Sequence, residues 1–217
     1  YHESTEMDDT KMIDELIAYS KVMYERKLIH ATGGNTSVRE GDVVWISQTG
    51  AKLGELTEKE IVKVDLDGNV LEGTAPSKEM GMHLAMLRAR KEMNAVIHVH
   101  PTFSIALSTT IKDDSRDAVP PYTAAVYVRA GRVPMVPYHA SGAHSLHEAV
   151  ESLAPVYHAL LLRQHGLLVS GKDMSDALGI VEEIEQCCEV AVAVGAAGEP
   201  LTQEQRDEID KAMGRSW

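Results

Sequence analysis

The stretch AVIHVHP, residues 95–101, carries the pattern that decides the fold of this chain. It is apolar and strand-like, and it ends at a proline. Side chains alternate between the two faces of a strand, so Ile97 and Val99 point one way while His98 and His100 point the other. Two imidazoles on one strand face can converge on one metal ion. They can equally be surface histidines of a half-exposed strand, and the heptapeptide alone leaves both interpretations open.

The whole chain has the size and composition of one globular domain. It has 217 residues, of which 44% are hydrophobic and 25% are charged, and a chain of this length buries a substantial core. We expect a single domain over residues 1–217, with the polar residues 1–8 as a tail. No repeat, low-complexity segment or linker marks a second domain.

The charge of the chain limits its partners. The formal net charge is −12, whereas binders of nucleic acid or anionic membranes need a basic face. We therefore expect neither partner, although a local basic pocket for a small anion remains compatible. No apolar run approaches the ~18 residues of a membrane span. The two cysteines, Cys187 and Cys188, are adjacent and form no disulfide framework. With no targeting segment, we expect a reducing, cytoplasmic location.

Hydrophobic periodicity and turn signals predict a mixture of helices and strands. Helical periodicity predicts helices over residues 8–28, 77–91, 101–111, 145–153 and 173–194, the last with Asp173 as its N-cap. Strand signals predict strands within 38–47 and over 95–99, a hairpin over 62–73 that turns at Asp67-Gly68, a buried strand or strand pair over 158–171, and strand-like structure over 119–138. Together they predict an α/β fold with an antiparallel-rich sheet packed between helices.

Two further features contain groups that bind metals or protons. His165 lies in RQHG, inside an apolar run, where a buried imidazole needs either a backbone carbonyl or a metal as its partner. Three histidines on apolar strands make a zinc site with an open fourth position reasonable. In PSKEMGMH, residues 76–83, Glu79 and His83 share one helix face. For His83 we expect an ordinary surface pair with Glu79, whereas Glu79 near a metal would be a fourth ligand or an acid/base group.

Small and hydroxyl-bearing residues gather in three further segments. GGNTS (33–37) and SQTG (47–50) combine glycines, which let the backbone approach an anion, with neutral hydrogen-bond donors. Ser77 and Lys78 at the start of a helix add donors, a dipole end and a charge. Each segment by itself predicts only a loop.

In their order and spacing, GGNTS, SQTG, PSKE, HVHP and RQHG resemble the class II aldolase/adducin family over roughly residues 10–195. The resemblance implies a three-layer α/β/α fold around a mixed, mostly antiparallel sheet. It also implies a homotetramer with active sites between subunits. By resemblance, His98, His100 and His165 are the zinc ligands, and Glu79 is the catalytic carboxylate. The phosphate-binding positions are Gly34, Asn35, Thr49, Gly50 and Ser77, with Lys78 beside them.

The resemblance implies a zinc-dependent lyase that breaks a carbon–carbon bond of a small phosphorylated sugar acid or ketose through an enediolate. The zinc ligands would also accept Mn²⁺ or Co²⁺. Aldolases of the family usually have Ser-Ser before the glutamate, whereas this chain has Ser77-Lys78, and their proton-donor tyrosine has no clear counterpart. PSKE followed by HLAMLRAR, and PPYTAAVYVRAG followed by VPMVPY, favour the 3-oxo-tetronate 4-phosphate decarboxylase branch.

Four alternatives remain open within this fold. The first three are enzymes: a ketose-1-phosphate aldolase, a pentulose-5-phosphate 4-epimerase and a dehydratase of a methylthio-sugar phosphate. The fourth is a non-catalytic scaffold of the adducin kind, which lacks the full zinc triad. Product identity separates the enzymes from one another, and metal content separates them from the scaffold.

Overall fold

The protein is built on one mixed sheet with helices on both faces. The computed structural model describes the backbone of residues 2–217 and the side chains from residue 8 onward. The strands are β1 (Asn35–Glu40), β2 (Val43–Ser47), β3 (Ile61–Asp65), β4 (Val70–Glu72), β5 (Ala95–Val99), β6 (Met135–Val136), β7 (Ala159–Leu162) and β8 (Gly166–Gly171). The helices are α1 (His2–Glu25), α2 (Met80–Ala89), α3 (Thr102–Thr110), α4 (Ala124–Ala130), α5 (His144–Leu153), α6 (Met174–Val194) and α7 (Gln203–Met213).

The eight strands of the described chain form one sheet in the order β4-β3-β2-β1-β5-β8-β7-β6. Every neighbouring pair is antiparallel except β6 and β7, which run parallel. The mixed, mostly antiparallel sheet is therefore confirmed. β5 lies at its centre, between β1 and β8, and all its residues, Ala95–Val99, are buried, so this strand is not a half-exposed one; His100 and Pro101 follow it.

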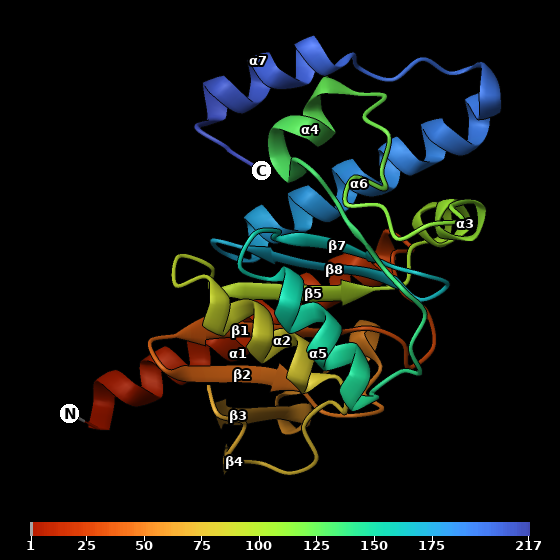
Figure 1. Cartoon of the computed structure of the whole chain (residues 1–217). Coiled ribbons are helices and arrows are strands. Elements are labelled where there is room, and N and C mark those ends of the chain that lie inside the picture. Colours follow the sequence, from red (N-terminus) through yellow and green to blue (C-terminus); the bar gives the residue numbers. More distant parts are fainter. Residues whose placement is uncertain (1) are drawn as a thin grey trace.

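Two hydrophobic cores lie on opposite faces of this sheet. One core joins the sheet to α1, α3, α4 and α6, and the other joins it to α2 and α5. Figure 1 shows α2 and α5 in front of the sheet and α1 behind it. Ile97 and Val99 belong to the first core and Val96 belongs to the second, as the strand period requires. The three layers are helices, sheet and helices.

Most of the predicted elements are present, with shifted ends. α1 begins at His2, within the stretch 1–8 that we expected to be a tail, and Tyr1 lies outside the described residues. The predicted helix after Pro76 begins at Met80. The apolar run 158–171 is a strand pair, β7 and β8. α6 begins after the predicted cap, because the Asp173 side chain accepts a 2.8 Å hydrogen bond from the Asp176 N–H.

The strand-like structure predicted over 119–138 is mostly wrong. Residues 124–130 form α4, and only Met135–Val136 are in a strand. The Thr123 side chain caps this helix by accepting from the Val126 N–H, and Gly131 ends it with φ of 64°. Packing of α4 on α6 overrides the strand preference of its valines and tyrosine.

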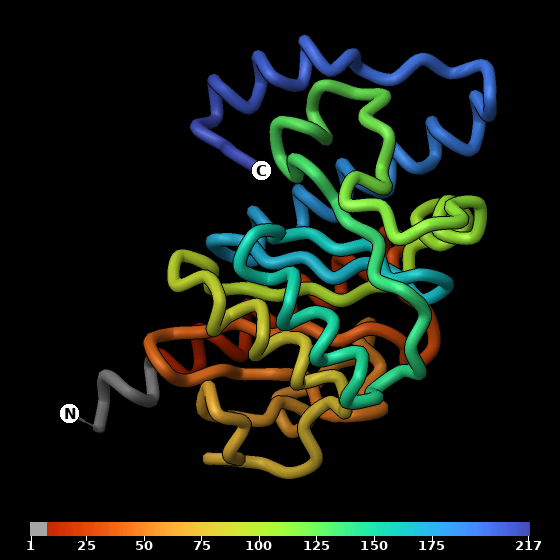
Figure 2. The backbone as a smooth tube through the Cα atoms, viewed as in Figure 1, coloured from red at the N-terminus to blue at the C-terminus, as the bar shows by residue number. Residues whose placement is uncertain are grey.

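The C-terminal helix α7 was not predicted, and it packs beside α4. Tyr127 on α4 donates a 2.9 Å hydrogen bond to Asp210 on α7, and Trp217 donates another to the same carboxylate at 2.8 Å. Figure 2 shows the chain returning past α4 to its C-terminal end. None of the helices among residues 2–217 is both long and apolar enough to cross a membrane.

Candidate metal centre and active site

Three imidazoles meet at the edge where β5 ends and β8 begins. His98 is the fourth residue of β5, His100 follows the strand, and His165 lies in the turn between β7 and β8. This turn lies against the end of β5, since a Cβ at Gly166 would lie only 2.1 Å from the Val99 carbonyl oxygen. The glycine of RQHG is what allows HVHP to approach so closely.

The spacing of the three rings suits a divalent cation. The His98 Nε2 atom lies 3.2 Å from His165 Nε2 and 3.0 Å from His100 Nε2. One nitrogen from each ring lies within 4.8 Å of the others. Tetrahedral zinc with Zn–N bonds of about 2.0–2.1 Å places its ligand nitrogens about 3.3–3.4 Å apart. The residues therefore fit a metal held by three imidazoles with small adjustments.

Two of the three rings show features of the form that binds metals. His98 Nδ1 lies 2.8 Å from the Leu167 carbonyl oxygen, so it is the donating N–H, and the lone pair of neutral His98 is on Nε2, facing the other two rings. Burial, and then the neighbouring His98 and His165, lower the pKa of His100 to about 3. Neutral imidazole is the form that ligates metals.

Glu79 faces the imidazoles from the start of α2. Its Oε2 atom lies 3.2 Å from His98 Nε2, and its Oε1 atom lies 3.2 Å from His165 Nε2. Asn35 donates to Oε2 at 2.9 Å and Ser141 donates to Oε1 at 2.8 Å. Burial by itself raises the pKa of Glu79, but its contacts with His165 and His98 and the hydrogen bond from Asn35 outweigh burial and hold that pKa well below its ordinary value.

The expectation that His83 forms a surface pair with Glu79 is wrong. His83 is fully buried on the side of α2 that faces the sheet, and it hydrogen-bonds Ser37 and Asn35. Its face of the helix packs on the sheet, so the i,i+4 spacing places both residues inward rather than outward. Burial is the main cause that lowers the pKa of His83 to about 3.

A cavity of about 220 Å³ adjoins the imidazoles and Glu79. All six residues expected around the phosphate line it: Gly34, Asn35, Thr49, Gly50, Ser77 and Lys78. His100 and Glu79 also line it, so the predicted metal and phosphate residues face one space. The sequence analysis did not single out four further lining residues, Thr32, Gly33, Gln48 and Ser141.

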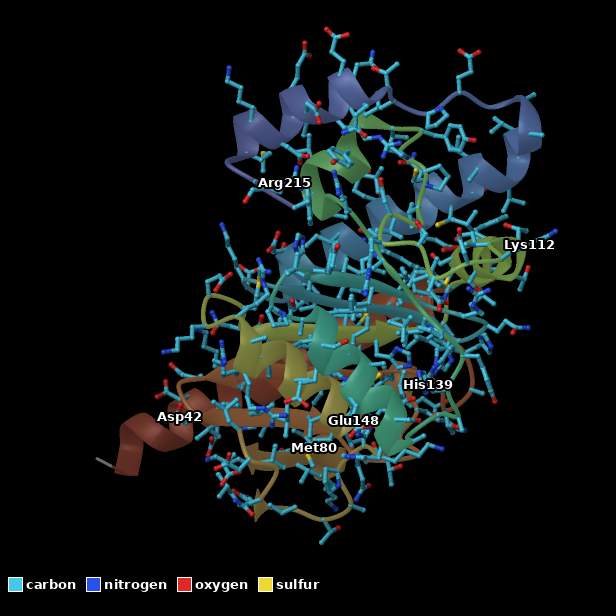
Figure 3. All side chains as sticks on the ribbon, in the orientation of Figure 1. Asp42, Met80, Lys112, His139, Glu148 and Arg215 are labelled. Carbon is cyan, nitrogen blue, oxygen red and sulfur yellow. The ribbon has the colours of Figure 1, made fainter. Side chains whose placement is uncertain are left out.

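Three of these omissions have a signal in the sequence, since Gln48 lies within SQTG and two others lie in the glycine loop, and one has none. Thr32 and Gly33 belong to the same glycine loop as Gly34. A Cβ at Gly33 would lie 2.7 Å from His100 Nδ1, so this loop passes close to the three imidazoles. Ser141 lies in the loop before α5, which no motif marks. The segment that leads into this loop, labelled at His139, and the start of α2, labelled at Met80, can be followed in Figure 3.

The donors for an anion in this cavity are mainly hydroxyl groups. The Thr49 N–H already donates to Ala75 O at 2.9 Å, so Thr49 has its hydroxyl left for a ligand. Ser77 Oγ accepts a hydrogen bond from the Glu79 N–H at 3.2 Å, which leaves the hydroxyl hydrogen free to donate. The start of α2 directs its dipole toward the same place.

Lys78 brings a cation to the mouth of the cavity. Its side chain is exposed, and its stem lies against Gly142. Among the described residues, no ion pair of Lys78 is found within 4.0 Å. Its charge is therefore available to an acidic ligand.

Three converging imidazoles, a facing carboxylate and an adjoining polar cavity are typical of a metal-dependent enzyme with a small anionic substrate. The chain belongs to the class II aldolase and adducin family: the Class II Aldolase and Adducin N-terminal domain matches residues 14–192. Members of this family named as aldolases and decarboxylases are its relatives, and the protein is a lyase of this class.

Two curated relatives show the range of this family. The 3-oxo-tetronate 4-phosphate decarboxylase of Pectobacterium atrosepticum is 35% identical over 182 residues, which cover 83% of this chain and 84% of the relative. The L-fuculose phosphate aldolase of Methanocaldococcus jannaschii is 36% identical over 172 residues, which cover 79% of this chain and 91% of the relative.

Solved structures show the same fold. The crystal structure of YgbL from Klebsiella pneumoniae matches with a TM-score of 0.88 and 30% identity, covering 93% of this chain and 98% of that one. An L-fuculose 1-phosphate aldolase matches with a TM-score of 0.84 and 30% identity, covering 94% of this chain and 97% of that one. The expected class II aldolase fold is therefore confirmed.

Proposed function

We propose that this protein is a zinc-dependent 3-oxo-tetronate 4-phosphate decarboxylase. The observation that carries the proposal is Lys78, a cation on the wall of a cavity that also holds Glu79 and His100. A substrate with both a phosphate and a carboxylate gains more from this charge than a ketose phosphate does. Curated relatives of that name are 33–35% identical to the chain, which supports the same choice.

In this proposal the cavity binds the phosphate, and the three imidazoles of His98, His100 and His165 lie beside the reacting carbons. The hydroxyl groups of Thr49 and Ser77, the glycine loop at Gly34, Gly50 and the start of α2 hold the phosphate. Their binding energy is remote from the bond that breaks, so it orients the substrate. The carboxylate then lies within reach of the Lys78 charge.

The reaction needs one proton in each turnover. Loss of CO₂ from the 3-oxo acid leaves an electron pair, which the neighbouring ketone takes up as an enediolate. Glu79, which is ionised at rest, takes up one proton from solvent in each turnover and passes it to C2, giving dihydroxyacetone phosphate. A divalent cation held by His98, His100 and His165 would supply Lewis-acid stabilisation of negative charge on the substrate oxygens. Zinc suits three neutral imidazoles, and Mn²⁺ or Co²⁺ would suit the same donors.

A product assay by NMR on the zinc-loaded protein tests this function. The protein is offered 3-oxo-tetronate 4-phosphates and, in parallel, ketose 1-phosphates. Release of CO₂ with formation of dihydroxyacetone phosphate from the acid is the expected result. Turnover of ketose 1-phosphates alone would overturn it.

A ketose-1-phosphate aldolase is the second candidate, because relatives named L-fuculose phosphate aldolase are as similar to this chain as the decarboxylases are. Lys78→Met separates the two. The variant should raise the KM of the acid substrate more than that of a ketose 1-phosphate, since only the acid has the extra carboxylate. An equal loss on both substrates would assign Lys78 to the phosphate and remove the argument for the acid.

The assembly and the location of the protein are the remaining parts of the proposal. A homotetramer with active sites between subunits stays a prediction from the resemblance, and a cytoplasmic location stays a prediction from the sequence features described above. Light scattering on the purified protein measures the first, and a monomer would contradict it.

A further inference from the structure

A line of buried polar groups lies behind Glu79. Ser37 Oγ is 2.6 Å from His83 Nδ1, and His83 Nε2 is 2.5 Å from Asn35 Oδ1. Asn35 Nδ2 then reaches Glu79 Oε2 at 2.9 Å. Asn35, Ser37 and His83 are each at most 6% exposed, and Glu79 is 4% exposed. The line therefore runs from the sheet to the carboxylate through direct hydrogen bonds between buried groups.

Two residue pairs with matching spacings, one on β1 and one at the start of α2, form this line. Asn35 and Ser37 are two residues apart on β1, so their side chains share one face of the sheet about 6.6–6.8 Å apart along the strand. Glu79 and His83 are four residues apart at the start of α2, a rise of about 6 Å. Because these spacings agree, His83 reaches both β1 residues while Glu79 lies beside Asn35.

The same face of the sheet carries the metal site. Asn35 and His98 are directly opposite each other on β1 and β5, and cross-strand partners share a face. Asn35 therefore lies between the metal ligand His98 and the interior histidine His83. The Asn35 amide therefore hydrogen-bonds both the buried His83 and the Glu79 carboxylate.

The need for one donor and one acceptor in each hydrogen bond determines which atom carries the hydrogen at each step of this line. An ionised Glu79 only accepts, so Asn35 must present its NH₂ group to it and its oxygen to His83. His83 must then donate from Nε2. A neutral imidazole has a bare Nδ1, so the Ser37 hydroxyl must donate to it. A rotated Asn35 amide would place its oxygen against the Glu79 carboxylate, two acceptors in contact.

We propose that His83 is a positioning residue for the reaction: by donating from Nε2 to Asn35, it holds the amide in the orientation that donates to Glu79. The inference rests on the proposed function in one respect, that Glu79 handles the proton on the substrate. It also gives Asn35 a second role, because both polar ends of its amide have protein partners.

Three variants separate positioning from packing. His83→Leu keeps the volume but has no donor for Asn35, so the amide is free to rotate. His83→Gln keeps an N–H donor at about the place of Nε2. His158→Leu is the control, because His158 is a partly buried histidine at the opposite end of β7 from His165, bonded to the Arg129 carbonyl.

The kinetic test uses the zinc-loaded variants and the best substrate of the wild-type enzyme. His83→Leu is expected to lower kcat about 10- to 100-fold, as loss of an outer hydrogen-bond partner does, with little change in KM. His83→Gln should recover most of that loss, and His158→Leu should keep the wild-type kcat. A wild-type kcat in His83→Leu, or equal losses in the Leu and Gln variants, would overturn the proposal.

A second readout needs no turnover. Nitrogen NMR of the ¹⁵N-histidine-labelled wild-type protein at pH 7.5 reports which ring nitrogen of each histidine carries the hydrogen. The neutral Nε2–H form of His83 is expected. A neutral Nδ1–H form or a charged ring would overturn the hydrogen-bond direction. If the wild-type protein turned over no sugar phosphate, the proposed function would fail, and the NMR result would still decide how His83 holds Asn35.

Discussion

The buried His83 makes a sharp prediction for the pH dependence of stability. Its pKa is about 3 in the folded protein, mainly because of burial, while a histidine in an unfolded chain has a pKa of about 6.5. At a pH between these two pKa values, the His83 ring is protonated in the unfolded chain and neutral in the folded protein. The free energy of unfolding must therefore decrease as the pH falls below 6.5.

The size of the effect follows from the two pKa values. At pH 7.5 the His83 contribution is close to zero, because the ring is neutral in both states. At pH 5.0 the unfolded chain gains about 2 kcal/mol from protonating this ring, and the folded protein gains almost nothing. Other histidines with lowered pKa, such as His100 and His158, add their own losses, so the His83 share must be isolated by a variant.

The assay is urea unfolding of the metal-free wild-type protein and of His83→Gln at pH 7.5 and 5.0. Metal is removed because protons compete with it for the imidazoles, so its binding would add a second pH dependence to the stability. The wild-type protein should lose about 2 kcal/mol more than the variant between the two pH values, because glutamine does not titrate. Equal losses in the two proteins would show that His83 is protonated in the fold and would refute the reasoning.

Three substitutions at the site complete the predictions. Glu79→Gln should keep the metal content, measured by elemental analysis, and lower kcat about 10²- to 10⁴-fold; near-wild-type turnover would contradict its role. His98→Ala should lose metal and activity together, so full metal occupancy in this variant would exclude His98 as a ligand. Gly166→Ala should lower the free energy of unfolding by about 1–3 kcal/mol, because its Cβ would lie 2.1 Å from Val99 O; an unchanged urea midpoint would contradict that contact.

Elements with local signals were predicted well. The Asp67-Gly68 turn joins β3 and β4, and Asp173 caps α6 through a side-chain bond within four residues. In both cases the group that specifies the structure lies next to the structure it specifies. The helix α4 was not predicted, because its valines and tyrosine favour a strand and only contact with α6 makes them helical.

The residues of the site likewise fall into those that the sequence could predict and those that it could not. His98, His100 and Glu79 could be named because they stand on regular elements of known period or in a family motif. Ser141 could not, because its bond to Glu79 spans 62 residues and its loop has no motif. His83 was assigned to the wrong side of its helix, since the i,i+4 spacing with Glu79 states that they share a face but not which face is buried.

The sequence by itself therefore determined most of the elements, the family and the groups that can hold a metal and a proton. These follow from alternation along strands, from helical period and from short motifs, all of which act over a few residues. Only the tertiary structure decided which faces are buried and which partners meet across the sheet. Register between β1 and β5 places Asn35 beside His98, and the packing of α2 places His83 against Asn35. Such contacts join residues far apart in the chain, so no local pattern in the sequence encodes them.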